Sequence, residues 1–109
     1  LVVELFRSNA DGGFADGKGG IVSCDGIRRE FAPGDKLRLA PGESVTLMPG
    51  DWHAFWGEGG DVLIGEVSTV NDDNTDNVFR EAIGRFSQIE EDEPPRHLLV
   101  SDYEKWLQY

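Results

Sequence analysis

The chain has 109 residues, 39% of them hydrophobic, and 21 acidic against 10 basic side chains give a formal net charge of -11 at pH 7. This length fits a single domain over residues 1–109, and the negative charge disfavours binding to nucleic acid or to an anionic membrane surface. No apolar run approaches the roughly 20 residues of a membrane span, and the lone cysteine, Cys24, excludes an intrachain disulfide. A soluble, cytoplasmic protein is expected.

Strand-like runs follow one another from the first residue onward. Leu1 opens directly into such a run, so we expect a preceding segment to belong to this domain. Turn signals made of Gly, Pro and Asp recur between the runs, which is typical of an all-β sandwich or barrel. The Asp25-Gly26 pair predicts a two-residue hairpin. The predicted strands cover residues 1–7, 20–24, 27–31, 36–39, 44–48, 53–57 and 61–68.

The composition changes after residue 69. Residues 70–77 form a polar tract that predicts a loop, and residues 98–100 are a candidate final strand. Ser101, followed three residues later by Glu104, resembles a capping box and predicts a short C-terminal helix.

The two histidines are not equivalent. His53 follows a Pro-Gly-Asp turn and begins a short aromatic strand, where alternation places His53 and Phe55 on one face and Ala54 and Trp56 on the other. Taken alone, this position is more typical of a structural histidine than of a ligand. His97 lies beside the last strand candidate, where a surface or structural role is expected.

Spacing around His53 resembles the second sequence motif of the cupin family. That motif runs Gly, five residues, Pro-x-Gly, two residues, His, three residues, Asn, and Gly42, Gly50 and His53 match it. Met48 replaces the expected Pro, with Pro49 one place later, and Gly57 replaces the Asn. The resemblance implies a small jelly-roll β-barrel in which His53 is a metal ligand.

Downstream segments are similar to the C-terminal half of the cupin-type D-lyxose ketol-isomerases. The downstream segments are residues 65–77, 83–86, 89–94 and 98–103, and residues 1–6 are similar to a strand that follows a Gly-rich turn in the family, so the resemblance covers essentially the whole chain. It implies interconversion of D-lyxose with D-xylulose and of D-mannose with D-fructose, with a sugar as the substrate. Mn2+, or else Zn2+, is the implied cofactor, and Asp73, Asp76 and Arg85 are the implied sugar-binding residues.

Glu66 is the expected catalytic acid/base. Alternation along residues 61–68 places Val62, Ile64 and Glu66 on one face. If that face is buried, the carboxylate is desolvated and becomes a stronger base. If the face lies on the solvent side, or if Glu66 only forms a salt bridge, the residue is structural. With the support of the family resemblance, the catalytic and structural roles stand about equal.

The His-x-His pair and the Glu that complete the family's metal site are absent from this sequence. One imidazole does not hold a catalytic metal, which needs at least three protein ligands. Glu4, on a strand face with Val2 and Phe6, is a weak candidate for a further ligand. Two hypotheses therefore stand: the chain is the C-terminal portion of a metal-dependent isomerase, or it is a metal-free half-cupin that acts as a binding or oligomerisation module. A half-barrel exposes strand edges that pairing with another chain would cover, so the second hypothesis predicts a homodimer.

Overall fold

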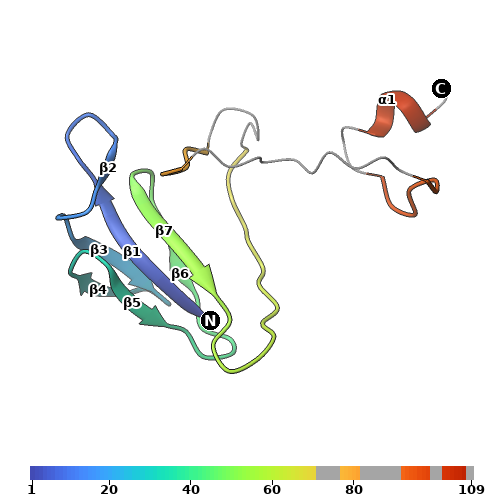
Figure 1. Ribbon diagram of the computed structural model, residues 1–109. Coiled ribbons are helices and arrows are strands. Elements are labelled where there is room, and N and C mark those ends of the chain that lie inside the picture. Colours follow the sequence, from blue (N-terminus) through green and yellow to red (C-terminus); the bar gives the residue numbers. More distant parts are fainter. Residues whose placement is uncertain (71–76, 82–91, 99–101, 108–109) are drawn as a thin grey trace.

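The computed structural model describes residues 1–70, 77–81, 92–98 and 102–107. Its strands gather in the first half of the chain, and one helical turn lies near the C-terminus (Figure 1). The all-β prediction is confirmed, and the arrangement is consistent with an incomplete cupin-like fold. The elements are β1 (Val2–Ser8), β2 (Phe14–Ala15), β3 (Gly20–Cys24), β4 (Ile27–Phe31), β5 (Asp35–Arg38), β6 (Val45–Thr46), β7 (Asp51–Trp56) and α1 (Tyr103–Trp106).

Two antiparallel sheets make up the fold. In the first sheet β1 is central: β7 pairs with one of its edges along Val2–Arg7, and β5 and then β2 pair with the other edge. In the second sheet β3 lies between β4 and the short β6. Strand β1 therefore organises the half of the fold that carries His53.

The hydrophobic core lies between the two sheets. Val3 and Leu5 alternate along β1 and meet Val22 and Cys24, which alternate along β3. Each of these four side chains is at most 3% exposed, and Phe31 of β4 joins the same cluster. Cys24 is a free, buried thiol, which agrees with the absence of a disulfide. Period-two alternation of apolar residues is what gives each sheet one buried face.

The hairpin predicted at Asp25-Gly26 joins β3 to β4. Both residues have positive φ, 49° for Asp25 and 81° for Gly26, as a type I′ turn requires. Asp25 also ties the hairpin to the approach of β6, because its carboxylate accepts hydrogen bonds from the Ser44 backbone N–H at 3.1 Å and hydroxyl at 2.7 Å. This prediction is confirmed.

Three turns of the form Xaa-Pro-Gly-acid share one construction. The carbonyl of the first residue accepts the fourth residue's N–H at 2.9–3.1 Å, and the fourth side chain accepts the first residue's N–H at 2.7–2.8 Å. The glycines have φ between 79° and 89°, which disfavours any side chain there. The predicted turns are thus confirmed at Ala32–Asp35, Ala40–Glu43 and Met48–Asp51.

The predicted strand over residues 61–68 is wrong. These residues are irregular and exposed, and Leu63 is 100% exposed. In Figure 1 the segment is an extended trace without a strand arrow. The physical reason is that a strand needs a partner for its backbone N–H and C=O groups, and no strand among the described residues pairs with this segment.

The remaining differences are small. Predicted strand 53–57 begins two residues earlier, 44–48 shortens to Val45–Thr46, 36–39 shifts to Asp35–Arg38, and the two-residue β2 was not predicted. Residues 99 and 100 of the last candidate strand lie outside the described residues.

The predicted C-terminal helix is present as α1, but its capping box is wrong. The N-cap is Asp102, one residue later than expected, and its side chain makes no capping hydrogen bond. Ser101 lies outside the described residues. No helix in the part of the chain that the structure describes has the length and apolar character to cross a membrane.

Candidate functional site

His53 lies on the face of the first sheet that carries the core. It stands opposite Leu5 in the β1–β7 pair, and Phe55 stands opposite Val3. Directly opposed residues share a face of an antiparallel sheet, so the predicted alternation is confirmed. The His53 and Phe55 rings stack at 6.1 Å with an angle of 13° between their planes. Unlike their partners on β1, both are exposed, so the core face is open over β7.

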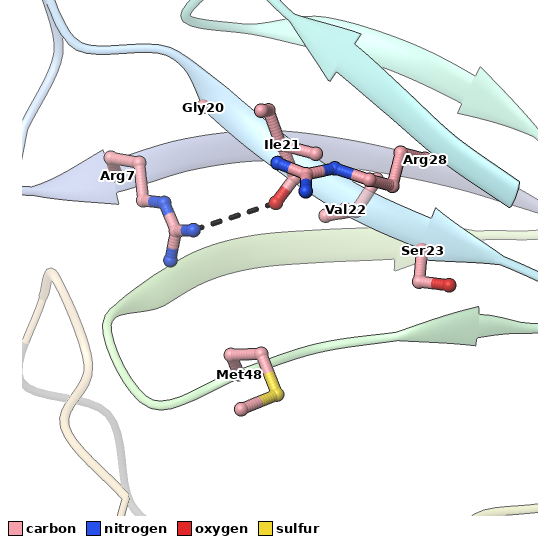
Figure 2. Close-up of a pocket in the computed structure, with 7 residues that line it drawn as sticks. All are labelled: Arg7, Gly20, Ile21, Val22, Ser23, Arg28 and Met48. Carbon is pink, nitrogen blue, oxygen red and sulfur yellow. Dashed lines mark hydrogen bonds between the residues drawn. The ribbon is translucent and has the colours of Figure 1, made fainter. Parts of the chain in front are cut away.

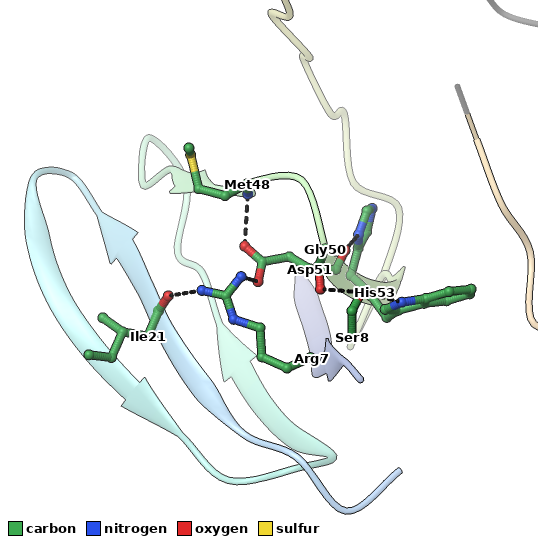
Figure 3. A network of polar contacts seen from close by, with 8 residues as sticks. Arg7, Ser8, Ile21, Met48, Gly50, Asp51 and His53 are labelled. Atoms are coloured by element: carbon green, nitrogen blue, oxygen red, sulfur yellow. Dashed lines mark hydrogen bonds and ion pairs between the residues drawn. The ribbon is translucent and has the colours of Figure 1, made fainter. Parts of the chain in front are cut away.

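The His53 ring is oriented by a backbone contact. Its Nδ1 lies 3.2 Å from the carbonyl oxygen of Asp51 (Figure 3). A carbonyl oxygen only accepts hydrogen bonds, so this contact is a hydrogen bond in the tautomer that carries its proton on Nδ1, and in that tautomer Nε2 has a lone pair. Metal-bound histidines commonly use one nitrogen as ligand while the other donates to a carbonyl or carboxylate. The geometry thus suits Nε2 as a donor to an electrophile.

An ion pair with a buried carboxylate holds the start of β7. The Asp51 carboxylate is 0% exposed and pairs with the Arg7 guanidinium of β1 through Oδ1, while Oδ2 accepts the Met48 N–H at 2.7 Å. Arg7 also donates to the carbonyl oxygen of Ile21 on β3 at 3.4 Å (Figure 3). The Arg7 guanidinium therefore links β1 to β7 and to the second sheet. It also pairs with Asp51, the acidic residue nearest to His53 in the sequence.

A second group of contacts supports the same turn. Ser8, at the end of β1, donates to the Gly50 carbonyl oxygen from its backbone N–H at 2.9 Å and from its hydroxyl at 3.1 Å. The Trp52 indole N–H donates to that hydroxyl at 3.0 Å. Sequence reasoning missed Arg7, Ser8 and Asp51 as positioning residues. The available signal was the acidic residue that closes the Pro49-Gly50 turn.

Glu66 lies in the irregular segment after β7 and is exposed. The expected burial beside apolar neighbours is not observed, because Val62 and Ile64 are themselves 39% and 44% exposed. Glu4 stands opposite Ala54 and Lys36, on the sheet face away from His53, so the structure does not support it as a ligand beside that histidine. His97 is exposed. The predicted sugar-binding residues lie outside the described residues: Asp73, Asp76 and Arg85.

The described residues do not form a complete metal centre. Residues 1–70, 77–81, 92–98 and 102–107 contain no group of three or more His, Cys, Asp or Glu side chains placed to hold a metal ion. His53 supplies one suitable nitrogen, and Asp51 is occupied by Arg7.

An open pocket of about 490 Å³ lies along β3 (Figure 2). Arg7 forms one wall, and Met48, from the turn before β7, forms another. The lining contains no carboxylate and no imidazole, so it offers no acid/base pair for sugar chemistry. The lining residues are Arg7, Gly20, Ile21, Val22, Ser23, Arg28 and Met48.

Comparison with known proteins identifies the family. A family model described as D-lyxose isomerase matches residues 1–103. A D-lyxose/D-mannose isomerase of Serratia proteamaculans is 51% identical over 109 residues, covering 98% of this chain and 47% of that relative. A D-lyxose/D-mannose isomerase of Escherichia coli O157:H7 is 44% identical over 108 residues, covering 97% and 47%. The chain spans about half the length of these relatives. It belongs to the D-lyxose isomerase family.

Proposed function

We propose that this chain forms part of an aldose–ketose isomerase that interconverts D-lyxose with D-xylulose and D-mannose with D-fructose. The observation that carries the proposal is the similarity to two D-lyxose/D-mannose isomerases over nearly the whole chain. The two aldoses have the same configuration from C2 to C4, so one site that reads those hydroxyls accepts both. The same similarity favours an isomerase over a metal-free binding module.

The reaction moves hydrogen between C1 and C2 of the open-chain sugar, which needs a base and an acid close to those carbons. Glu66 is the proposed acid/base. Glu66 is exposed, which leaves room for a sugar. A carboxylate becomes a stronger base when it is removed from water, and the bound substrate and the rest of the fold would supply that cover. Asp73, Asp76 and Arg85 are proposed to hydrogen-bond the sugar hydroxyls, for which a planar guanidinium fork is well suited.

His53 is proposed to contribute one imidazole ligand to a divalent metal, with Mn2+ expected and Zn2+ as the second choice. The orientation of its ring supports this role, since Nδ1 lies at hydrogen-bond distance from the Asp51 carbonyl oxygen, which leaves Nε2 as the nitrogen to coordinate the metal. The ligand lies on the core face of the sheet. The other ligands come from outside the described residues, as the family resemblance implies.

The proposed activity is tested in a chimera of the Serratia proteamaculans relative whose matching part is replaced by this chain. We expect the chimera to convert D-lyxose to D-xylulose in the presence of Mn2+. Glu66→Gln should lower kcat by about 100- to 10,000-fold, the range for loss of a general acid/base. Asp61→Asn, a matched change in the same exposed segment, should leave kcat unchanged. An inactive chimera, or full activity with Glu66→Gln, would contradict the proposal.

The proposed metal ligand is tested on the same chimera by elemental analysis after equilibration with Mn2+. We expect about one bound Mn2+ per chain, because the proposal gives each chain a single metal site whose several donors surround one ion. His53→Gln should remove the bound metal, and His97→Gln, a change at the other histidine, should retain it. Equal metal content in the two variants would show that His53 is not a ligand.

A further inference from the structure

The turn that precedes His53 is held by more contacts than the other two turns of the same form. In all three turns an acidic side chain at the fourth position accepts the backbone N–H of the first residue. Asp35 and Glu43 are exposed and pair with no cation among the described residues, whereas Asp51 is buried and also pairs with Arg7. A turn of this kind therefore forms without an ion pair, and the pair at Asp51 has another purpose.

Stability alone does not explain why this carboxylate is buried. The Asp51 side chain is 0% exposed, and that of Arg7 is 29% exposed. Removing charges from water is costly, and well-packed apolar residues in place of a buried ion pair are often equally or more stabilising. An ion pair differs from apolar packing in its fixed geometry, because its donors and acceptors are satisfied in few orientations. The Arg7–Asp51 pair is therefore suited to holding a neighbouring group in place.

The Arg7 side chain has little freedom to move away from Asp51. Its guanidinium pairs with Asp51 on β7 and donates to the carbonyl oxygen of Ile21 on β3 at 3.4 Å (Figure 3). The side chain lies against Gly20, where an added Cβ would be 2.6 Å from Nε and 2.9 Å from Cγ of Arg7. Glycine at this position leaves the space that the arginine fills. The guanidinium is therefore a fixed partner for the carboxylate.

Asp51 transmits this constraint to the imidazole of His53. Its carboxylate is held on two sides, by Arg7 at Oδ1 and by the Met48 N–H at 2.7 Å from Oδ2. Its backbone N–H donates to the Met48 carbonyl oxygen at 2.9 Å. Because these contacts and the pairing of β1 with β7 fix the Asp51 backbone, its carbonyl oxygen is held 3.2 Å from Nδ1 of His53.

We propose that Arg7 and Asp51 are positioning residues for His53, and that their ion pair keeps the imidazole in the tautomer with its proton on Nδ1. In that tautomer Nε2 has the lone pair that a metal ion needs. Without the fixed carbonyl oxygen the proton can reside on either nitrogen, and the form protonated on Nε2 must lose that proton before Nε2 can coordinate. The inference rests on the proposed role of His53 as a ligand and adds the residues that prepare it.

The tautomer is measured by nitrogen NMR of labelled histidine in the metal-free chimera of this chain with the Serratia proteamaculans relative. The spectra are recorded at about pH 8, above the range in which histidines ordinarily titrate, and His53→Gln identifies the His53 signals. We expect the Nδ1–H tautomer to predominate in the unchanged chimera and both tautomers to be present in Asp51→Asn. Asparagine has one side-chain acceptor oxygen where the site uses two, so it cannot accept from both Met48 and Arg7.

The affinity for Mn2+ is the second measurement. Loss of a group that orients a metal ligand typically weakens metal binding about 10- to 100-fold, so Asp51→Asn should raise the Kd for Mn2+ by that factor. Electron paramagnetic resonance of free Mn2+ during a titration measures the Kd. The double variant Arg38→Met/Glu58→Gln is the matched control, because it removes an exposed ion pair, and it should leave the tautomer and the Kd unchanged.

A second variant covers the case in which Asp51→Asn does not fold. Arg7→Met/Asp51→Asn leaves no unpaired charge, and it should show the same mixture of tautomers and the same weakened binding. Circular dichroism establishes that each variant is folded. A folded variant without the ion pair that keeps the Nδ1–H tautomer, or that binds Mn2+ with an unchanged Kd, would overturn the proposal. An unchanged chimera in which the Nε2–H tautomer predominates would also overturn it.

The positioning role and the proposed function fail separately. An active chimera whose His53 tautomer does not respond to loss of the ion pair would remove the positioning role and leave the isomerase function standing. An inactive chimera that binds no Mn2+, but in which loss of the ion pair shifts the tautomer, would remove the function and support the positioning role.

Discussion

Replacing Arg7 with methionine should lower the free energy of unfolding by about 3–5 kcal/mol, the cost of leaving a buried charge without its partner. The Asp51 carboxylate is 0% exposed, and Arg7 is its partner in the ion pair. Methionine keeps most of the aliphatic length and removes the charge, so the loss reports the ion pair rather than packing. Urea unfolding followed by tryptophan fluorescence measures it, and the Arg7→Met/Asp51→Asn double variant should recover part of the loss.

Arg38→Met is the matched control for an exposed ion pair. Arg38 and Glu58 are 63% and 53% exposed, so removing the guanidinium should cost far less than Arg7→Met. Hydrogen bonding from Arg38 holds the pKa of Glu58 below its usual value. A lowered folded pKa stabilises the fold above the unfolded pKa, and this contribution is lost as pH falls through the lowered value. Equal losses for Arg7→Met and Arg38→Met at neutral pH would contradict the assigned role of Arg7.

Leu5→Ala should destabilise the fold by about 2–5 kcal/mol, the range for removing a fully buried leucine side chain. Leu5 is 1% exposed and belongs to the cluster that joins the two sheets. The substitution leaves a cavity between β1 and β3. Strand β1 also pairs with β7, so the cavity lies next to the strand that supports β7. The midpoint of urea unfolding measures the change.

Leu63→Ala is the control for that core substitution. Leu63 is 100% exposed in the segment after β7, so its truncation removes no buried contact and should leave the midpoint unchanged. If Leu63→Ala were as destabilising as Leu5→Ala, the segment after β7 would have to be packed in solution, and the description of that segment would be wrong.

Local chemistry explains which features of the fold could be predicted. Asp25-Gly26 tolerates positive φ at both positions, so the hairpin needed no information from distant residues. The Pro-Gly-acid turns are similar, because proline sets φ, glycine accepts positive φ and the acidic side chain closes the turn from within four residues. Alternation placed His53 and Phe55 together for the same reason.

Contacts between distant segments decided the rest. The pattern of residues 61–68 is that of a strand, but a strand exists only with a partner, and none of the described residues provides one. The burial expected for Glu66 depended on that pairing. The ion pair of Arg7 with Asp51 was equally invisible, since it forms only when β7 lies beside β1.

The sequence by itself determined the all-β class, the turns and the face of β7 that carries His53, because each depends on φ preferences and period-two alternation within a few residues. The family motif around His53 is likewise a matter of short spacing. Only the tertiary structure decided that β1 lies between β5 and β7, that the Asp51 carboxylate pairs with Arg7, and that the core-side residues of β7 are exposed. Those features depend on which distant strands find partners, and a strand's own residues do not specify its partner.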